Sequence, residues 1–450
     1  AFLSIVFALQ VKDKMQQHAT LIYTSSALGA VFAGDLFTLF IFWEMMALSS
    51  VFLIWANRSK RAYKAGFRYF VYQFLSGIIL LIGIVVYWQQ HGDLGFSHMS
   101  LNSWASWLIF IAFGIKCAFP LLHTWLTDAY PEATACGTVL LSALTTKVAV
   151  YALARGFAGT EILVYIGAVM TCFPIFYAVI ENDLRRVLAF SLINQLGFMV
   201  VGIGIGTELA VNGAVAHAFN DILFKGLLFM SMGAVLHMTG RINGSELGGL
   251  YKTMPKTTLL CIIGAASISA FPLFNGFVSK SMVMTAALNE GYSAIWFALL
   301  FASAGVFHHA GIKIPYFAFF GHDSGIRAQD PPANMLLAMF IAAGLCLAIG
   351  IYPNLLYQYL PYQLEYSPYD MTHVLAQTQL LFFAALAFAW LNIKGIYPPE
   401  LPSTNLDVDW IYRKWLPEKW AFLSRYAFLL VDRGNRRIKL AVNRLIAQLK

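Results

Sequence analysis

Long apolar runs separated by short polar segments make up most of this chain. A helix needs about 20 predominantly apolar residues to cross the hydrocarbon core of a bilayer. Runs of that order lie near residues 19–33, 36–56, 66–88, 105–125, 133–157, 161–180, 186–205, 209–238, 257–288, 292–320, 333–354 and 374–393. The pattern therefore predicts an all-α polytopic membrane protein with twelve transmembrane helices. Residues 1–11 are also apolar, and we interpret them as the remnant of a further span.

The composition agrees with a bilayer environment. Hydrophobic residues make up 59% of the chain and charged residues 12%, whereas soluble domains are roughly a quarter charged. The five cysteines lie in apolar stretches without paired spacing, so we expect neither disulfides nor a metal site. Because the chain has no P-loop and no dinucleotide-binding motif, no cofactor is expected.

Basic residues are segregated to alternate loops. They are Lys12 and Lys14; Arg58, Lys60, Arg61, Lys64 and Arg68; Arg185 and Arg186; Arg241, Lys252 and Lys256; and Arg327. The loops at 89–104, 206–208, 289–291 and 355–373 contain no Lys or Arg. The positive-inside rule places the basic loops and the basic C-terminal tail on the cytoplasmic side of a bacterial inner membrane. The net charge of +8 is thereby explained without a nucleic-acid partner, for which no binding motif is present.

The tail ends in an amphipathic pattern. Apolar residues recur at helical spacing between Ile438 and Leu449, and Lys and Arg occupy the other faces. Such a helix binds either anionic membrane lipids or a partner subunit.

Ionisable residues lie inside several predicted spans. They are Glu44, Lys116, Lys147, Lys225 and Lys280. Each costs at least a few kcal/mol at membrane depth and therefore needs a reason. One alternative is that the lysines snorkel to the membrane surface, which suits lysines near helix ends, but Lys147 and Lys225 have apolar turns on both sides. Another is a static ion pair with Glu44, which accounts for one lysine and leaves three unpaired. Because a buried lysine releases its proton more readily than one in water, we predict a proton relay.

One predicted helix carries several polar residues on a single face. His217, Asp221 and Lys225 are spaced by four residues, and His237 lies three turns further along. Histidine passes protons through either ring nitrogen, and Asp221 is placed to tune Lys225 or accept charge from it. The alternative is a polar seam that holds helices together.

Proline interrupts two spans close to a buried lysine. Pro120 follows Lys116, and Pro272 with Gly276 precedes Lys280. Proline removes a backbone donor, and broken helices at membrane depth mark ion sites in transporters. The breaks fall at comparable places in two blocks of five spans, which predicts inverted repeats.

Polar residues near span ends have two interpretations. His123, Asp128 and Glu132 form a proton-uptake mouth, or they cap the helices there. Lys313, close to His308 and His309, is an interfacial anchor or contributes to the exit path.

Six segments carry a family resemblance. They are LFIFWEMMALSSVFLIW, GIKCAFPLLHTWLTDAYPEA, LLSALTTKVAVYALAR, NDLRRVLAFSLINQLGFM, HAFNDILFKGLLFMSMGAVLH and FPLFNGFVSK. In this order they resemble the signatures of the proton-conducting membrane subunits of respiratory complex I and of Mrp-type multisubunit Na+/H+ antiporters. The tail segment NLDVDWIYRKW resembles extensions found in the D-type subunits of Mrp antiporters, which favours the Mrp branch.

The resemblance implies a domain division. A remnant span and loop (1–18) precede two inverted repeats (19–157 and 158–320), C-terminal helices (321–393) and a cytoplasmic tail (394–450). It also implies that Glu44 and Lys116 form a switchable ion pair. Protons then pass through Lys147 and the helix of His217 and Lys225 to Lys280. Asp221 departs from the family, in which many members have a second histidine there.

The function so implied is that of a transporter subunit, not an enzyme. It moves protons in a multisubunit Na+/H+ antiporter and works only with other membrane subunits. The nearest alternative is a proton-pumping subunit of a complex I-like, membrane hydrogenase or bicarbonate-uptake complex. A non-conducting structural subunit and a stand-alone small-molecule transporter are further alternatives.

Overall fold

A computed structural model describes residues 1–402, 405–425, 428 and 432 of the chain. The chain divides into two units, Ala1–Ser403 and Thr404–Lys450. All predicted spans lie in the first unit. In the second, the π-helix η6 (Ile411–Trp415) continues as a helix to residue 425. The amphipathic helix predicted between Ile438 and Leu449 lies outside the described residues.

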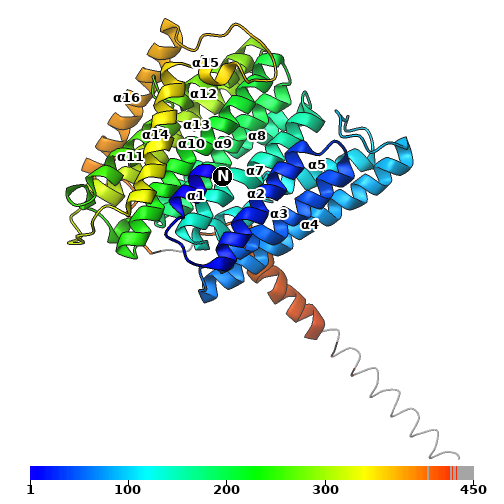
Figure 1. Cartoon of the computed structure of the whole chain (residues 1–450), viewed down its shortest axis with the longest axis horizontal. Helices are drawn as coiled ribbons and strands as arrows, with labels where there is room; N and C mark the ends of the chain where they lie inside the picture. The colour runs from blue at the N-terminus through cyan, green and yellow to red at the C-terminus, as the bar shows by residue number, and fades with distance from the viewer. Residues whose placement is uncertain (403–404, 426–427, 429–431, 433–450) are drawn as a thin grey trace, which may run out of the picture. The chain divides into compact units, whose positions relative to one another are not determined.

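The first unit consists of helices joined by short loops (Figure 1), as predicted. Its first stretch contains α1 (Phe2–Phe7), α2 (Lys14–Phe32), α3 (Leu36–Trp55), α4 (Lys60–His91), α5 (Trp104–Lys116), α6 (Thr124–Ala129), η1 (Tyr130–Glu132) and α7 (Ala135–Phe157). The second contains α8 (Ile162–Ile180), α9 (Leu184–Ile205), α10 (Glu208–Thr239), η2 (Gly244–Glu246), η3 (Leu250–Lys252), α11 (Pro255–Ile268), α12 (Asn275–Asn289), α13 (Ser293–Val306), η4 (Phe307–Lys313) and η5 (Tyr316–Phe320). The last contains α14 (Ala333–Ile351), α15 (Asn354–Tyr357) and α16 (Met371–Ile393).

All twelve predicted spans are helical. Within the described residues, nine helices are long and apolar enough to cross a membrane. The other three predicted spans correspond to α2 and to the interrupted helices α5–α6 and α11–α12. The all-α polytopic fold class is therefore confirmed.

The same series of elements occurs twice along the chain. Helices α8, α9 and α10 begin 148 residues after α2, α3 and α4, respectively, and α4 and α10 each have 32 residues. Asp35 and Asp183 cap the second helix of each series, and each forms an isolated β-bridge, to Gly95 and Asn243. We propose that these series are the two repeats predicted at 19–157 and 158–320.

The two helix breaks have the same sequence and backbone. Ala118–Leu121 and Ala270–Leu273 both read Ala-Phe-Pro-Leu. The Ala and Leu have positive φ in both, 60° and 70° in the first break and 58° and 75° in the second. This conformation costs an L-residue roughly 1–2 kcal/mol, so both breaks are built against a local backbone preference. Gly276, after the second break, lies where a Cβ would overlap the carbonyl oxygen of Ser267.

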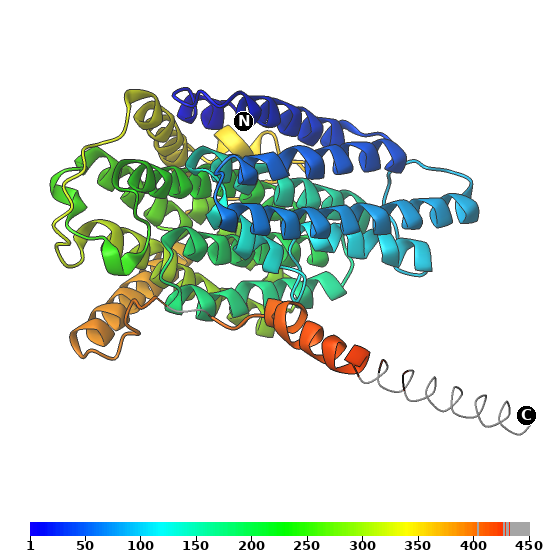
Figure 2. The same cartoon turned by 90° about the horizontal axis from the view of Figure 1, so that it is seen from below.

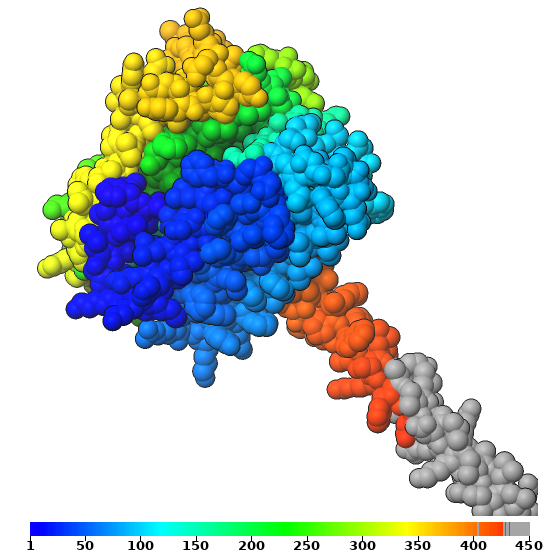
Figure 3. All heavy atoms as spheres, turned by 45° about the vertical axis from the view of Figure 1, so that its right-hand side comes forward, coloured from blue at the N-terminus to red at the C-terminus, as the bar shows by residue number. Residues whose placement is uncertain are grey.

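Three helices form the centre of the first unit. The apolar windows of α7 and α9 are 89% and 94% buried, and that of α10 is 72% buried. Figures 1 and 2 show them enclosed by the other helices, and α10 packs against α7, α9, α11, α12 and α14. On the outside, α1 packs against α14, and Figure 3 shows the α1–α3 segment (blue) beside the α14 region (yellow).

Candidate functional site

Lys116 is held beside the helix that carries Glu44. Its Nζ donates to the carbonyl of Trp43 at 2.5 Å and lies 4.4 Å from the centroid of the Trp43 ring. The Glu44 carboxylate packs onto α4 at Gly77, where a Cβ would overlap Oε1. That oxygen is buried and has no hydrogen-bond partner among the described residues. The two charges interact electrostatically, while the hydrogen bond of Lys116 goes to the backbone.

An ion pair joins the two repeats at the centre of the molecule. Lys147 Nζ on α7 lies 2.5 Å from Asp221 Oδ2 on α10, and both side chains are buried. Asp221 therefore forms its ion pair with Lys147, and it also interacts electrostatically with Lys225. Lys225, four residues along the same face, donates to the Ser191 hydroxyl of α9 at 2.7 Å.

His217 connects three helices. Its Nδ1 lies 3.0 Å from the Ser279 hydroxyl on α12, and its Nε2 lies 3.1 Å from Gln195 Oε1 on α9. The neighbouring Lys280 reaches back across the helix break, where its Nζ donates to the carbonyl of Ile268 at 2.8 Å. The break thus leaves a backbone carbonyl free to accept from a side chain, whereas in an unbroken helix that carbonyl accepts from a backbone N–H of the same helix.

Sequence reasoning missed the neutral partners of this axis. Ser191, Gln195 and Ser279 are fully buried and contact Lys225 or His217. The sequence feature that could have identified these partners is the presence of hydroxyl and amide side chains inside apolar helices. Buried polar groups need hydrogen-bond partners, so these residues mark the helix faces that meet.

A cavity of about 680 Å³ adjoins Lys280. It lies between α12, α13 and the first turns of α16, and Thr285, Asp370 and His373 also line it. His373 Nε2 lies 3.1 Å from the Thr285 hydroxyl, and the His373 ring pairs with Asp370, the N-cap of α16. The polar axis therefore opens, at Lys280, toward the loop at 355–373.

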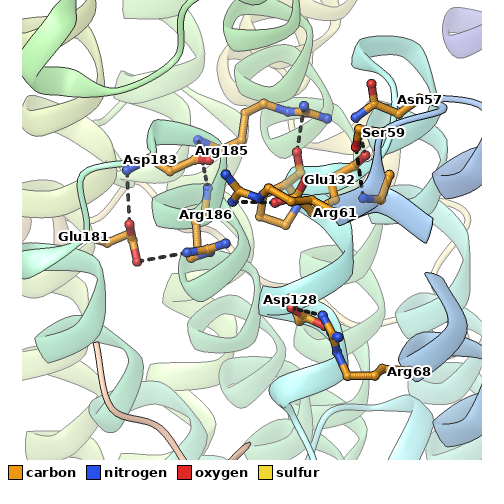
Figure 4. Close-up of polar contacts among 12 residues, drawn as sticks. Asn57, Ser59, Arg61, Arg68, Asp128, Glu132, Glu181, Asp183, Arg185 and Arg186 are labelled. Atoms are coloured by element: carbon orange, nitrogen blue, oxygen red, sulfur yellow. Dashed lines mark hydrogen bonds and ion pairs between the residues drawn. The ribbon is translucent and has the colours of Figure 1, made fainter. Parts of the chain in front are cut away.

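Ion pairs cover the end of the bundle that bears the basic loops (Figure 4). They are Arg61–Glu132, Arg68–Asp128 and Arg186–Glu181, with N–O distances of 2.7, 2.7 and 3.8 Å. Asp128 and Glu132 are therefore held in ion pairs by arginines of α4, while neither α6 nor η1 has a side-chain cap at its N-terminus. The uptake mouth at these residues stays a prediction.

Two further histidines, His123 and His237, complete the residues predicted for the path. His123 is buried just before α6, with its ring 4.7 Å from that of Phe173. His237 is exposed in the last turn of α10. The part of these two histidines in proton movement stays a prediction.

The interpretation of Lys313 as an interfacial anchor is wrong. The side chain is fully buried and donates to the carbonyls of Val179 and Glu181, both at 2.7 Å, at the end of α8. Its Nζ also pairs with Glu400 at 2.8 Å. The π-helical turns of η4 direct this side chain inward, which a regular helical count did not indicate.

The arrangement suits acid–base chemistry by side chains alone. Amines, an imidazole and carboxylates follow one another across α5, α7, α10 and α12. In the part of the chain that the structure describes, no cluster of three or more His, Cys, Asp or Glu is suited to a metal ion. All five cysteines are unbonded.

The chain is similar in sequence and fold to known membrane-protein subunits. The chain is 29% identical over 354 residues to the D component of a Na(+)/H(+) antiporter from Alkalihalophilus pseudofirmus, covering 74% of this chain and 71% of the relative. It is 28% identical to hydrogenase-4 component B of Escherichia coli, covering 73% of this chain and 55% of the relative. Its fold matches a chain of the Mrp complex from Dietzia sp. with a TM-score of 0.73 at 22% identity, covering 88% and 83% of the two chains.

A family assignment follows from the extent of a further match. Residues 33–308 match the family described as NADH:quinone oxidoreductase/Mrp antiporter, transmembrane. This region contains Glu44 and the four lysines of the axis, from Lys116 to Lys280. The chain belongs to this family of proton-antiporter membrane subunits.

Proposed function

We propose that the chain is the proton-translocating subunit of a multisubunit Na+/H+ antiporter in a bacterial inner membrane. The observation that carries this proposal is the Lys147–Asp221 ion pair between the two repeats. Lys116, Lys225 and Lys280 are buried on neighbouring helices. The likeness to the D component of the Alkalihalophilus antiporter supports the assignment to this kind of complex.

The proposed step at the centre is an exchange of one proton. Lys147 holds it as an ammonium that Asp221 stabilises. Transfer of that proton toward Lys225 leaves Lys147 neutral and Asp221 as an uncompensated buried carboxylate, which is costly. The carboxylate then favours the arrival of the next proton from the Lys116 side.

The proposed setting follows from charge and family. The basic loops face the cytoplasm, and the loop at 355–373 faces the opposite side. Other membrane subunits and lipids surround the chain, which acts as a transporter subunit and not as an enzyme.

A second candidate is a subunit of a redox-driven complex, favoured by the likeness to hydrogenase-4 component B, of which the chain spans about half the length.

The test uses inverted vesicles that contain the complete complex. A pH gradient is formed first, and Na+, K+ or a redox donor is then added in separate experiments. Collapse of the gradient by Na+ supports the antiporter. Proton pumping by the redox donor, with no response to any cation, rejects the antiporter in favour of the second candidate.

A further inference from the structure

A second group of buried titratable residues lies outside the axis already described. It is carried by the span Ser293–Phe320, whose helix changes from α to π at Phe307. π-Helical turns are rare and occur frequently at functional sites. Here the turns bring His309 and Lys313 into the interior, where both are fully buried.

Helix capping explains only part of this arrangement. Lys313 donates to the carbonyl of Glu181, the C-cap of α8. In the first series, Arg155 donates to the carbonyl of Ala33, the C-cap of α2, at 2.7 Å. Arg155 also contacts the Tyr151 hydroxyl at 2.9 Å, so a basic cap in this fold can be completed by a neutral group.

The second series places a carboxylate at this position. Glu400, in the segment after α16, lies 2.8 Å from Lys313 Nζ, and its side chain is 5% exposed. Its Oε2 would lie 3.4 Å from a Cβ at Gly244, so the loop of η2 leaves room for the carboxylate. Burial raises the pKa of the Glu400 carboxyl, and the Lys313 ammonium opposes that rise. A buried ion pair contributes little net stability, so the pair calls for another reason.

His309, four residues before Lys313 on η4, is the third buried titratable residue of this group. The ring interacts with the backbone of Gly305, but no side chain among the described residues gives either ring nitrogen a partner of hydrogen-bond geometry. The imidazole interacts electrostatically with both Lys225 and Lys313. In the first series Tyr151 lies four residues before Arg155, as His309 does before Lys313, and its hydroxyl donates to the carbonyl of Val31 at 2.7 Å. A buried polar group without a partner needs an explanation.

The π-helical segment also contacts the second helix break. A Cβ at Gly311 would overlap the Ser269 hydroxyl. Ser269 follows Ile268, whose carbonyl accepts from Lys280. The charged or titratable groups around the pair are His308 and His309 on η4, Tyr397 beside Glu400, and Glu181 after α8 with its partner Arg186. Lys225 on α10 interacts with His309.

We propose that Glu400, Lys313 and His309 form a proton-uptake branch from the basic face to Lys225. The proposal rests on the proposed function and names a second inlet to it. Glu400 takes up a proton and passes it to Lys313 when that amine is neutral. Lys313 protonates one nitrogen of His309, and the other nitrogen releases a proton to neutral Lys225, with water molecules completing the gaps. One proton enters and one reaches the axis, and no other bond changes.

The test compares variants of the complete complex at matched assembly. Glu400→Gln removes one proton carrier at nearly constant volume, His309→Phe replaces the other with a ring that carries no exchangeable proton, and Tyr151→Phe is the matched control in the first series. Initial rates of proton movement are measured from pH 6 to 9 with both a cation pulse and a redox donor. We expect Glu400→Gln and His309→Phe to lower the rate at least about tenfold, while Tyr151→Phe leaves it unchanged.

Failure of the branch and failure of the proposed function give different results. Wild-type rates in both branch variants, with loss of transport in Lys147→Ala, overturn the branch alone. An unaltered rate in Lys147→Ala overturns the proposed function. If no cation and no redox donor drives proton movement in the wild type, both are overturned. Because Glu400→Gln lies in a loop segment, it separates loss of transport from a folding defect in η4.

Discussion

At the scale of single residues, the central ion pair is the contact with the largest predicted effect. Asp221→Ala leaves the Lys147 ammonium buried without a counter-charge, at a cost of roughly 3–5 kcal/mol. We therefore expect the thermal stability of the complex to fall, together with proton transport. The double variant Lys147→Met with Asp221→Leu should recover stability but not transport. Equal stability of Asp221→Ala and the wild type would contradict the ion pair.

Gly77 provides a second residue-scale prediction. A methyl group at this position would overlap the Glu44 carboxylate. Gly77→Ala should therefore displace Glu44 and lower proton transport by about tenfold or more. Gly226→Ala is the matched control, because that glycine lies in α10 with nothing within 4 Å of its Cβ position. Equal transport rates in both variants would show that the position of Glu44 does not matter.

The sequence predicts which residues are buried at this scale, but not how they pair. Glu44 and the lysines stand out because charge within an apolar run has few explanations. The partner of Asp221 was missed because Lys147 lies on α7 and the pairing depends on the register of α7 against α10. Lys313 was misplaced because a π-helical turn changes which side chains face inward.

At the scale of elements, the N-cap of α3 allows a pH test. The Asp35 carboxylate accepts from the backbone N–H of Thr38 at 2.8 Å and from its hydroxyl at 2.7 Å. These bonds lower the pKa of Asp35 below its ordinary value of 3.8. The cap is therefore fully stabilising above that value and is lost as the pH falls through the lower pKa of the folded state.

Removal of the Asp35 cap should lower the stability of the complex by the same amount at every pH in the neutral range. Asp35→Ala should lower stability by about 1 kcal/mol, whereas Asp35→Asn, also a good N-cap, should cost little. The gap between wild type and Asp35→Ala should stay constant from pH 8 to 5, as measured by thermal unfolding of the complex. A gap that narrows between pH 7 and 6 would contradict the lowered pKa.

Helix breaks illustrate how far the sequence leads at this scale. Pro120 and Pro272 predicted both interruptions, and the structure confirms them between α5 and α6 and between α11 and α12. The shared Ala-Phe-Pro-Leu was overlooked because four residues carry little weight in a comparison of long apolar segments. The φ angles of the two breaks are similar, which shows that the short sequence match corresponds to the same backbone conformation.

At the scale of the whole molecule, composition and periodicity were enough to predict an all-α membrane fold. The lipid-facing surface imposes long apolar helices, so span positions are readable from hydropathy. The order in which the helices pack cannot be read from hydropathy, because every outer helix is similarly apolar. Enclosure of α7, α9 and α10 follows instead from their polar residues and from the repeat of the series.

The most direct test of the account is the initial rate of Na+-driven proton movement in Lys147→Ala. Complexes are compared with the wild type at matched assembly, with Lys252→Ala as the control because Lys252 is about half exposed, at 48% of its side chain. The account predicts a loss of about 100-fold or more in Lys147→Ala and a wild-type rate in Lys252→Ala. A wild-type rate in Lys147→Ala would contradict proton passage through the buried axis.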